Sequence, residues 1–195
     1  MENTSDFNEK QSLQIIEEMI LSARKDIKDN GFYYLLWGWL VFISAITQFV
    51  LLKMENPYHY MVWSFLMPLG AIVSVIYGRV EKRKAKVKTY MDEFMAYLWG
   101  GFVIALILVL YFMAKIGYAN ANPLIMILYG IGTFVSGGAL RFRPLILGGI
   151  ACWLLAFISF YSSYDVGLLL LALSVLVSYI IPGHMLKAKY QDSHV

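Results

Sequence analysis

Six polar or aromatic side chains within otherwise apolar stretches are the best candidates for ligand binding. They are Thr47, Gln48, Trp63, Ser64, Tyr111 and Tyr129. If they converge in space, they line an aromatic pocket with a few orienting hydrogen bonds, which suits a small neutral or aromatic solute. The alternative is that these groups bond between helices or anchor the chain at a membrane surface. Gln48 is the most informative of them, because an amide facing lipid is costly and is therefore expected to point inward.

Groups that carry enzymatic or metal chemistry are nearly absent from the same stretches. Asp92 and Glu93 stand at the start of an apolar run, where carboxylates stabilise a helix N-terminus. Within the spans, no second His or carboxylate stands one helical turn from His59 or His184, and the single cysteine, Cys152, cannot build a disulfide or a redox pair. The sequence contains no nucleophile elbow, P-loop or zinc-binding helix motif. We therefore expect no enzymatic activity, no cofactor and no metal site.

The elements that must position these residues are membrane spans. Hydrophobic residues make up 59% of the chain and charged residues 15%, and the mean hydropathy is +0.62. Runs long enough to cross a bilayer, roughly 17 to 25 residues, occupy 32–53, 58–78, 93–115, 123–140, 145–161 and 166–186. The sequence therefore predicts an all-α fold, a polytopic bundle of six transmembrane helices.

Positive charge lies almost entirely on one side of these spans. Of the 16 Lys and Arg, all except Lys53 and Lys115 flank the side that also holds both termini. The positive-inside rule then predicts a bacterial cytoplasmic (inner) membrane protein with both termini in the cytoplasm. The net charge of +3 is explained by this topology, so we expect no nucleic-acid partner.

One segment between the second and third spans is strongly basic. It contains Arg79, Lys82, Arg83, Lys84, Lys86 and Lys88. Such a cluster favours anionic lipid headgroups, although topological anchoring alone would also account for it.

A shift of the sequence by 62 residues aligns the first two spans with the next two. Eleven of the 48 positions from 32 to 79 match, and both a Trp-Gly and a Val-Ser dipeptide recur. A degenerate third copy includes Gly148 and Ser178. This pattern predicts three repeated hairpins in a pseudo-threefold arrangement, a design that often holds a binding site at the repeat interface.

Small residues recur at four-residue spacing on the even-numbered spans. They are Gly70, Ser74 and Gly78, then Gly132 and Ser136, then Ser174 and Ser178. Small faces let helices approach closely in lipid, so they indicate internal helix packing. A homodimer seam or a ligand-lined path is the alternative.

The polar segment 1–31 precedes the transmembrane domain 32–186 and the cytoplasmic tail 187–195. Leu13, Ile16, Ile20 and Ile27 follow a helical period, which predicts an amphipathic cytoplasmic helix. Such a helix can dock on the bundle, on the membrane or on a partner.

Three stretches resemble a family of small uncharacterised bacterial six-span membrane proteins. They are residues 34–42 (YLLWGWLVF), 129–140 (YGIGTFVSGGAL) and 178–184 (SYIIPGH). The resemblance implies the six-span fold but no activity. In size and span number the chain is also similar to substrate-binding subunits of energy-coupling vitamin transporters, without a diagnostic ligand motif.

The leading hypothesis is a non-enzymatic protein that acts through helix packing and contact with membrane lipid, with a partner membrane protein or with a second copy of itself. The alternative is a small-solute binding or permease subunit that uses the outer-half pocket. The sequence names no ligand for such a pocket.

Overall fold

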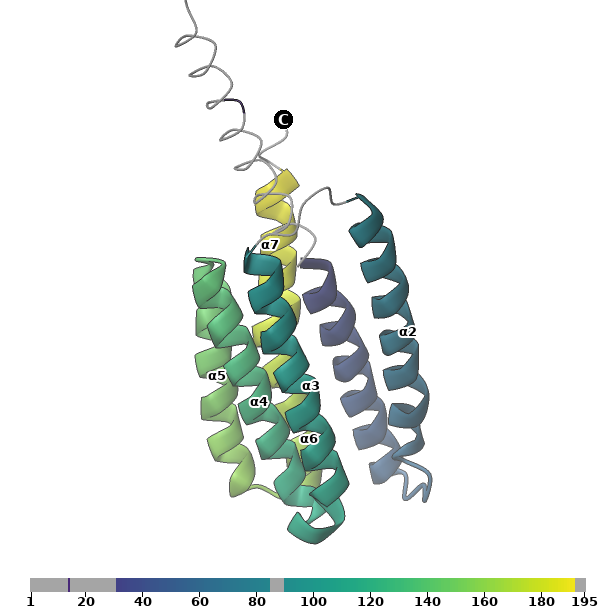
Figure 1. Cartoon of the computed structure of the whole chain (residues 1–195). Coiled ribbons are helices and arrows are strands. Elements are labelled where there is room, and N and C mark those ends of the chain that lie inside the picture. Colours follow the sequence, from purple (N-terminus) through teal and green to yellow (C-terminus); the bar gives the residue numbers. More distant parts are fainter. Residues whose placement is uncertain (1–13, 15–30, 85–89, 192–195) are drawn as a thin grey trace, which may run out of the picture.

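A computed structural model of the chain describes residues 14, 31–84 and 90–191. Within these residues, six helical spans are long and apolar enough to cross a membrane (Figure 1). The first span runs over Gly31–Lys53, followed by α2 (Met61–Lys84), α3 (Tyr90–Ile116), α4 (Tyr118–Ala139) and α5 (Arg143–Phe160). The sixth span, Tyr164–Ala188, consists of α6 (Tyr164–Val175), a π-helical turn η1 (Leu176–Ile180) and α7 (Ile181–Gln191).

The prediction of an all-α protein with six spans is confirmed, with span ends that differ by a few residues from the sequence estimates. The predicted amphipathic helix within 1–31 lies outside the described residues, apart from Gln14. Its docking surface therefore stays a prediction.

Short turns join the helices and keep neighbours antiparallel. Gly117 adopts a φ of 88°, which a residue without a Cβ accommodates readily, and this lets α4 begin directly after α3. After α4, the Phe142 N–H returns to the Gly137 carbonyl at 2.9 Å. Pro144 stands at the start of α5, where its missing N–H costs nothing.

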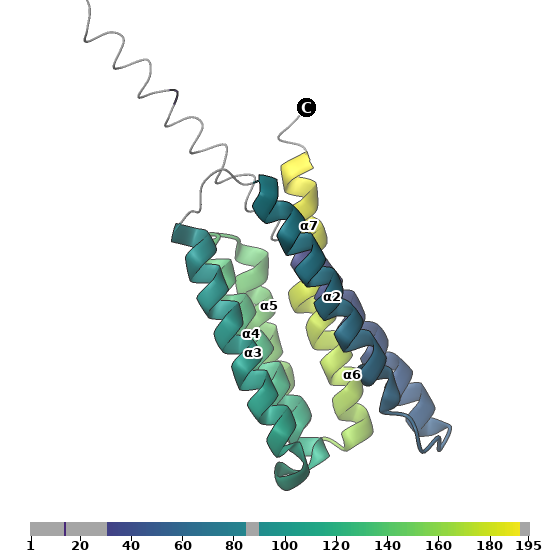
Figure 2. The same cartoon turned by 45° about the vertical axis from the view of Figure 1, so that its right-hand side comes forward.

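The helices form two layers (Figure 2). One layer contains α3, α4 and α5, and the other contains α2, the first span and the sixth span. Contacts of α6 and η1 with α4 and α5 join the two layers. The fourth and sixth spans are the most central. In the 18-residue apolar stretch of each, 56% and 61% of the residues are buried, whereas the corresponding share is 6% for both α2 and α3.

Glycines set the distance between the central helices. A Cβ on Gly149 of α5 would lie 2.8 Å from the Gly130 carbonyl of α4, and one on Gly148 would lie 2.7 Å from the Ser178 Cα of η1. On the first span, a Cβ on Gly38 would meet Tyr179 at 2.9 Å. Because lipid gives no hydrophobic drive between helices, such close backbone contact is a main source of association.

The π turn in the sixth span has a local cause. Pro182 has no N–H to offer the Ser178 carbonyl one turn earlier, and its ring would crowd that carbonyl in a regular α-helix. The chain widens instead, and the Ile181 N–H bonds to the Leu176 carbonyl five residues back. The turn lies at the centre of the bundle, where Ser178 and Tyr179 are buried.

Charges separate between the two ends of the bundle because successive helices are antiparallel. One end, called here the basic end, holds the end of α2, the turn that leads from α4 into α5 and the end of α7 (Figure 1). These segments contain Arg79, Arg83, Arg141, Arg143 and Lys187. The opposite end holds the ends of the first span and of α3, which contain Lys53 and Lys115. The asymmetry seen in the sequence is thus a property of the folded bundle.

The glycine contacts predict a clear contrast between two helix positions. Gly149→Ala should destabilise the protein by about 1–3 kcal/mol, because the new methyl group overpacks the α4–α5 contact. Gly101→Ala should be neutral or stabilising, since no described atom apart from the adjoining backbone of α3 lies within 4 Å of its Cβ position and alanine is the better helix former. Thermal unfolding in detergent measures both, and equal effects of the two substitutions would contradict this account.

Candidate functional site

Gln48 lies at the centre of a hydrogen-bond network near the end of the bundle that carries Lys53 and Lys115. Its side chain is 4% exposed. The Trp63 indole N–H donates to Gln48 Oε1 at 2.5 Å, and Gln48 Nε2 donates to the Tyr164 hydroxyl at 2.8 Å. Gln48 Nε2 also lies 3.2 Å from His59 Nδ1. This Gln48 network (Gln48, His59, Trp63 and Tyr164) joins the first span to α2, to the loop before it and to α6.

An ion pair adjoins the Gln48 network. Lys53 Nζ lies 2.6 Å from Asp165 Oδ2, and the Ser163 hydroxyl donates to Asp165 Oδ1. Because the Lys53 side chain is 57% exposed, the pair is worth little energy on its own. It nevertheless joins the end of the first span to the start of α6, as the hydrogen bond between Gln48 and Tyr164 also does. Two side-chain interactions therefore connect these two segments.

Only part of the predicted outer pocket comes together. Gln48 and Trp63 are in contact, and Thr47 is half-buried beside them in the sequence. Ser64 is exposed, Tyr111 is 77% exposed on α3, and Tyr129 lies in the core among other rings. The Gln48 amide bonds to side chains of α2 and α6. It thus acts as an interhelical clamp, which holds the first span to these two helices.

His59 and Tyr164 belong to the Gln48 network but were not among the predicted pocket residues. The sequence did carry one usable signal. In an antiparallel bundle, odd-numbered spans end on the side where even-numbered spans begin. Gln48 is near the end of the first span and Tyr164 begins the sixth, so both lie near the same end of the bundle. Nothing in the spacing indicates that the first and sixth spans are neighbours, and that contact is what brings the two side chains together.

A second cluster, called here the tyrosine cluster, lies at the centre between the two layers. It contains Tyr34, Trp99, Phe102, Tyr129 and Tyr179. The Tyr129 and Tyr179 rings lie 5.2 Å apart at 82°, and the Tyr34 and Trp99 rings 5.9 Å apart at 71°. Such edge-to-face contacts stabilise aromatic pairs beyond the area they bury. The Tyr179 hydroxyl is buried without a hydrogen-bond partner among the described residues.

The small residues of the even-numbered spans lie at contacts within the chain. A Cβ on Gly70 would meet the Trp37 ring at 3.4 Å, and the Trp37 indole N–H donates to Ser74 Oγ at 3.1 Å. A Cβ on Gly132 would meet the Trp99 ring at 3.3 Å in the same way.

The other small residues have similar surroundings. Ser136, Ser174 and Ser178 are buried and donate to carbonyls of their own helices. A Cβ on Gly78 would lie 3.0 Å from the Tyr33 hydroxyl.

The basic segment after α2 is described only in part. Arg79 and Arg83 are exposed at the basic end. Lys82 and Lys84 belong to α2, but their side chains, like all of Lys86 and Lys88, lie outside the described part of the chain. Its affinity for lipid headgroups stays a prediction.

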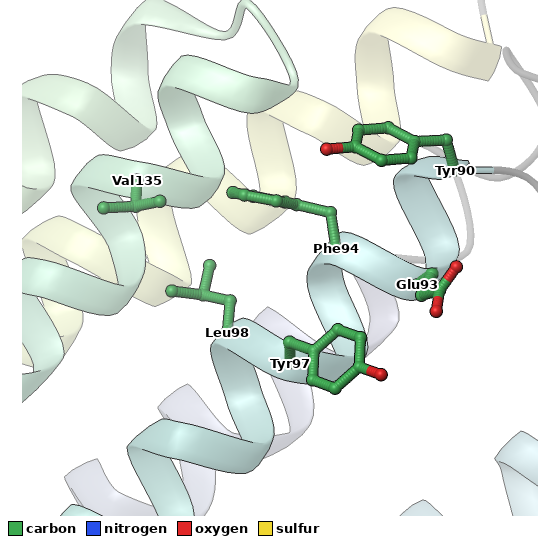
Figure 3. A pocket seen from close by; sticks show the side chains of 6 residues that line it. All are labelled: Tyr90, Glu93, Phe94, Tyr97, Leu98 and Val135. Carbon is green, nitrogen blue, oxygen red and sulfur yellow. The ribbon is translucent and has the colours of Figure 1, made fainter.

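A surface groove opens between the first turns of α3 and the facing part of α4. It has a volume of about 430 Å³ and is lined by Tyr90, Glu93, Phe94, Tyr97, Leu98 and Val135. Figure 3 shows Phe94 and Leu98 reaching from α3 toward Val135 on α4, whereas Glu93 and Tyr97 project away from it. This aromatic groove therefore combines an apolar floor, three rings and one carboxylate.

Metal-ligating side chains do not gather in the described residues. No group of three His, Cys, Asp or Glu lies close enough there to hold a metal ion. Cys152 is buried, and its thiol lies 3.7 Å from the Ser174 carbonyl.

Comparisons with protein-family models, curated proteins and solved structures give no match for this chain. The class of the protein accordingly rests on its composition and fold. Six apolar helices of membrane-crossing length define a multi-pass helical membrane protein, and such helices imply contact with lipid.

The Gln48 network predicts that Gln48→Leu destabilises the bundle. The substitution leaves the Trp63 N–H without its acceptor and the Tyr164 hydroxyl without its donor, and buried groups that lose their partners cost about 1–3 kcal/mol. Thr47→Val, a substitution of similar shape at the adjacent half-buried position, should change stability by less than about 0.5 kcal/mol. Thermal unfolding in detergent compares the two, and an unchanged Gln48→Leu protein would argue against the clamp.

For Tyr179→Phe in the tyrosine cluster, we expect a change in stability of the opposite sign to that of Gln48→Leu. Removing a buried hydroxyl that has no partner should leave stability unchanged or raise it by up to about 1 kcal/mol. Tyr179→Ala should lower it by roughly 3–5 kcal/mol, because the ring is lost as well. If Tyr179→Phe proves as damaging as Tyr179→Ala, the hydroxyl and not the ring is what the cluster needs.

Proposed function

We propose that this protein is a non-enzymatic, multi-pass protein of the bacterial cytoplasmic membrane that acts through its membrane-facing surface, by contact with lipid or with a partner membrane protein. The observation that carries the proposal is the uneven burial of the spans. The fourth and sixth spans make the core, whereas 6% of the apolar windows of α2 and α3 is buried. Almost all residues of these two stretches thus remain at least partly uncovered by the rest of the protein.

The use of polar groups in the interior supports the same function. The Gln48 amide bonds to Trp63 and Tyr164, and serines of the central spans bond to their own helices. Polar groups that form these bonds support the packing of the helices and are not available to bind a solute. By contrast, large apolar side chains along the outer faces, such as Ile72 at 57% and Ile104 at 63% exposure, are free to meet lipid or another helix.

The orientation and the repeat belong to this proposal. The positive-inside rule supports a cytoplasmic location for the basic end and for both termini. Contacts at equivalent positions, Trp37 against Gly70 and Trp99 against Gly132, support the hairpin repeat. Membership of the small bacterial six-span family rests on the three quoted stretches alone.

The experiment that tests the function is site-specific photocrosslinking in membranes. A photoreactive residue replaces Ile72 of α2 or Ile104 of α3, and the control replaces Leu154 of α5, which is exposed to a similar extent at 64%. We expect the α2 and α3 probes to capture a discrete protein, or a lipid class above its share of the membrane. The α5 probe should capture bulk lipid. Identical products from all three positions would argue against a dedicated surface.

A thermal-shift screen against a metabolite library tests the permease alternative. Under our proposal no metabolite stabilises the protein through the Gln48 network. A metabolite that raises the unfolding temperature of the natural protein, but not of the Gln48→Leu variant, would overturn the proposal in favour of a solute-binding subunit.

A further inference from the structure

We propose that the aromatic groove on α3 and α4 binds the headgroup of a phospholipid that carries a primary ammonium group. The inference rests on the proposed function and deepens it, because it names one class of lipid and one site. It assigns the recognition of the ammonium group to Glu93 with Tyr90 and Tyr97, and the contact with the lipid's apolar part to Phe94, Leu98 and Val135.

The lining of the groove follows from the periodicity of α3. Tyr90, Glu93, Phe94, Tyr97 and Leu98 are separated by three or four residues, so they share one side of the helix. Tyr90 is 84% and Tyr97 is 75% exposed, and both lie in the first two turns of the span. Tyrosine is favoured at this depth because its ring sits among headgroups while its hydroxyl remains hydrated. The groove therefore lies where the polar part of a lipid is found.

The chemistry of the lining selects a cation. Glu93 supplies the only charge among the six lining residues, and no Lys or Arg in the described part of the chain forms an ion pair with it. Aromatic faces attract cations as well, and the groove contains three rings. A primary ammonium can donate charge-assisted hydrogen bonds to the carboxylate, whereas a quaternary ammonium has no N–H to donate. An anionic headgroup without an amine would be repelled by Glu93.

The surroundings of the groove favour a lipid over a soluble amine. Its floor is apolar, and only 6% of the most apolar stretch of α3 is buried, so this helix is largely uncovered by the rest of the protein. One turn beyond Tyr97, Gly101 leaves open space along the same side of α3, since no described atom apart from the adjoining backbone of α3 lies within 4 Å of its Cβ position. An acyl chain can extend there.

Lipid titration of the full-length protein tests the proposal. The purified chain in detergent is titrated with phosphatidylethanolamine, phosphatidylcholine or phosphatidylglycerol of identical acyl chains, and bound lipid is counted by native mass spectrometry. We expect phosphatidylethanolamine to bind about tenfold more tightly than the other two, the difference that one charge-assisted hydrogen bond provides. Glu93→Gln should abolish this preference.

Matched variants separate the site from general effects of charge and of exposed rings. Asp92→Asn makes the same change in charge one residue earlier, at a position that does not line the groove, and should keep the preference. Tyr97→Leu should weaken binding of the ethanolamine lipid, whereas Tyr111→Leu, at an equally exposed ring near the other end of α3, should not. Unfolding temperatures of all four variants confirm that each is folded.

Several outcomes would overturn the inference. They are equal binding of the choline and ethanolamine lipids, retention of the preference by Glu93→Gln, its loss in Asp92→Asn, or tighter binding of the anionic lipid. Displacement of the lipid by millimolar free phosphoethanolamine would overturn it too, since the ligand would then be a soluble amine. None of these results bears on the crosslinking of α2 and α3, so the proposed function can stand if the lipid site fails.

Discussion

The absence of water in the hydrocarbon layer is the constraint on which this structure depends. A polar group inside costs free energy unless it finds a partner in the protein, and helices satisfy their own backbones first. The serines of the central spans then bond to carbonyls of the same helices, and Gln48 bonds to side chains of two other segments. With these groups satisfied, association is left to close backbone contact at glycines such as Gly148 and Gly149.

This constraint also divides the molecule into a core and a periphery. Small residues concentrate where α4, α5 and the sixth span meet, and there the helices approach until no Cβ fits. Bulky aliphatic residues dominate the outward faces of α2 and α3. The first group of helices thus packs against itself, whereas the outward faces of α2 and α3 are left uncovered by the rest of the protein. The groove beside Glu93 belongs to the periphery, where a polar headgroup can still be reached.

The sequence predicted the number and approximate limits of the spans, because hydropathy reflects the transfer of each segment into lipid, which depends on that segment alone. It also predicted that Gln48 points inward. It did not predict which spans are neighbours. Tyr34, Tyr129 and Tyr179 come from three different spans, and only the tertiary contacts bring their rings together. Tyr111, assigned to a pocket by its depth in the membrane, faces outward because depth does not determine which side of a helix a residue occupies.

The π turn of the sixth span acts as a one-residue insertion in an otherwise regular helix. Each residue of an α-helix turns the chain by about 100°, so deletion of one residue from Leu176–Ile180 would rotate the last turns of the sixth span by about that angle. Gly183 would leave Leu35, and Leu186 would leave Gly31. The contact between the start of the first span and the end of the sixth is thus set by the length of a single turn in the middle of the sixth span.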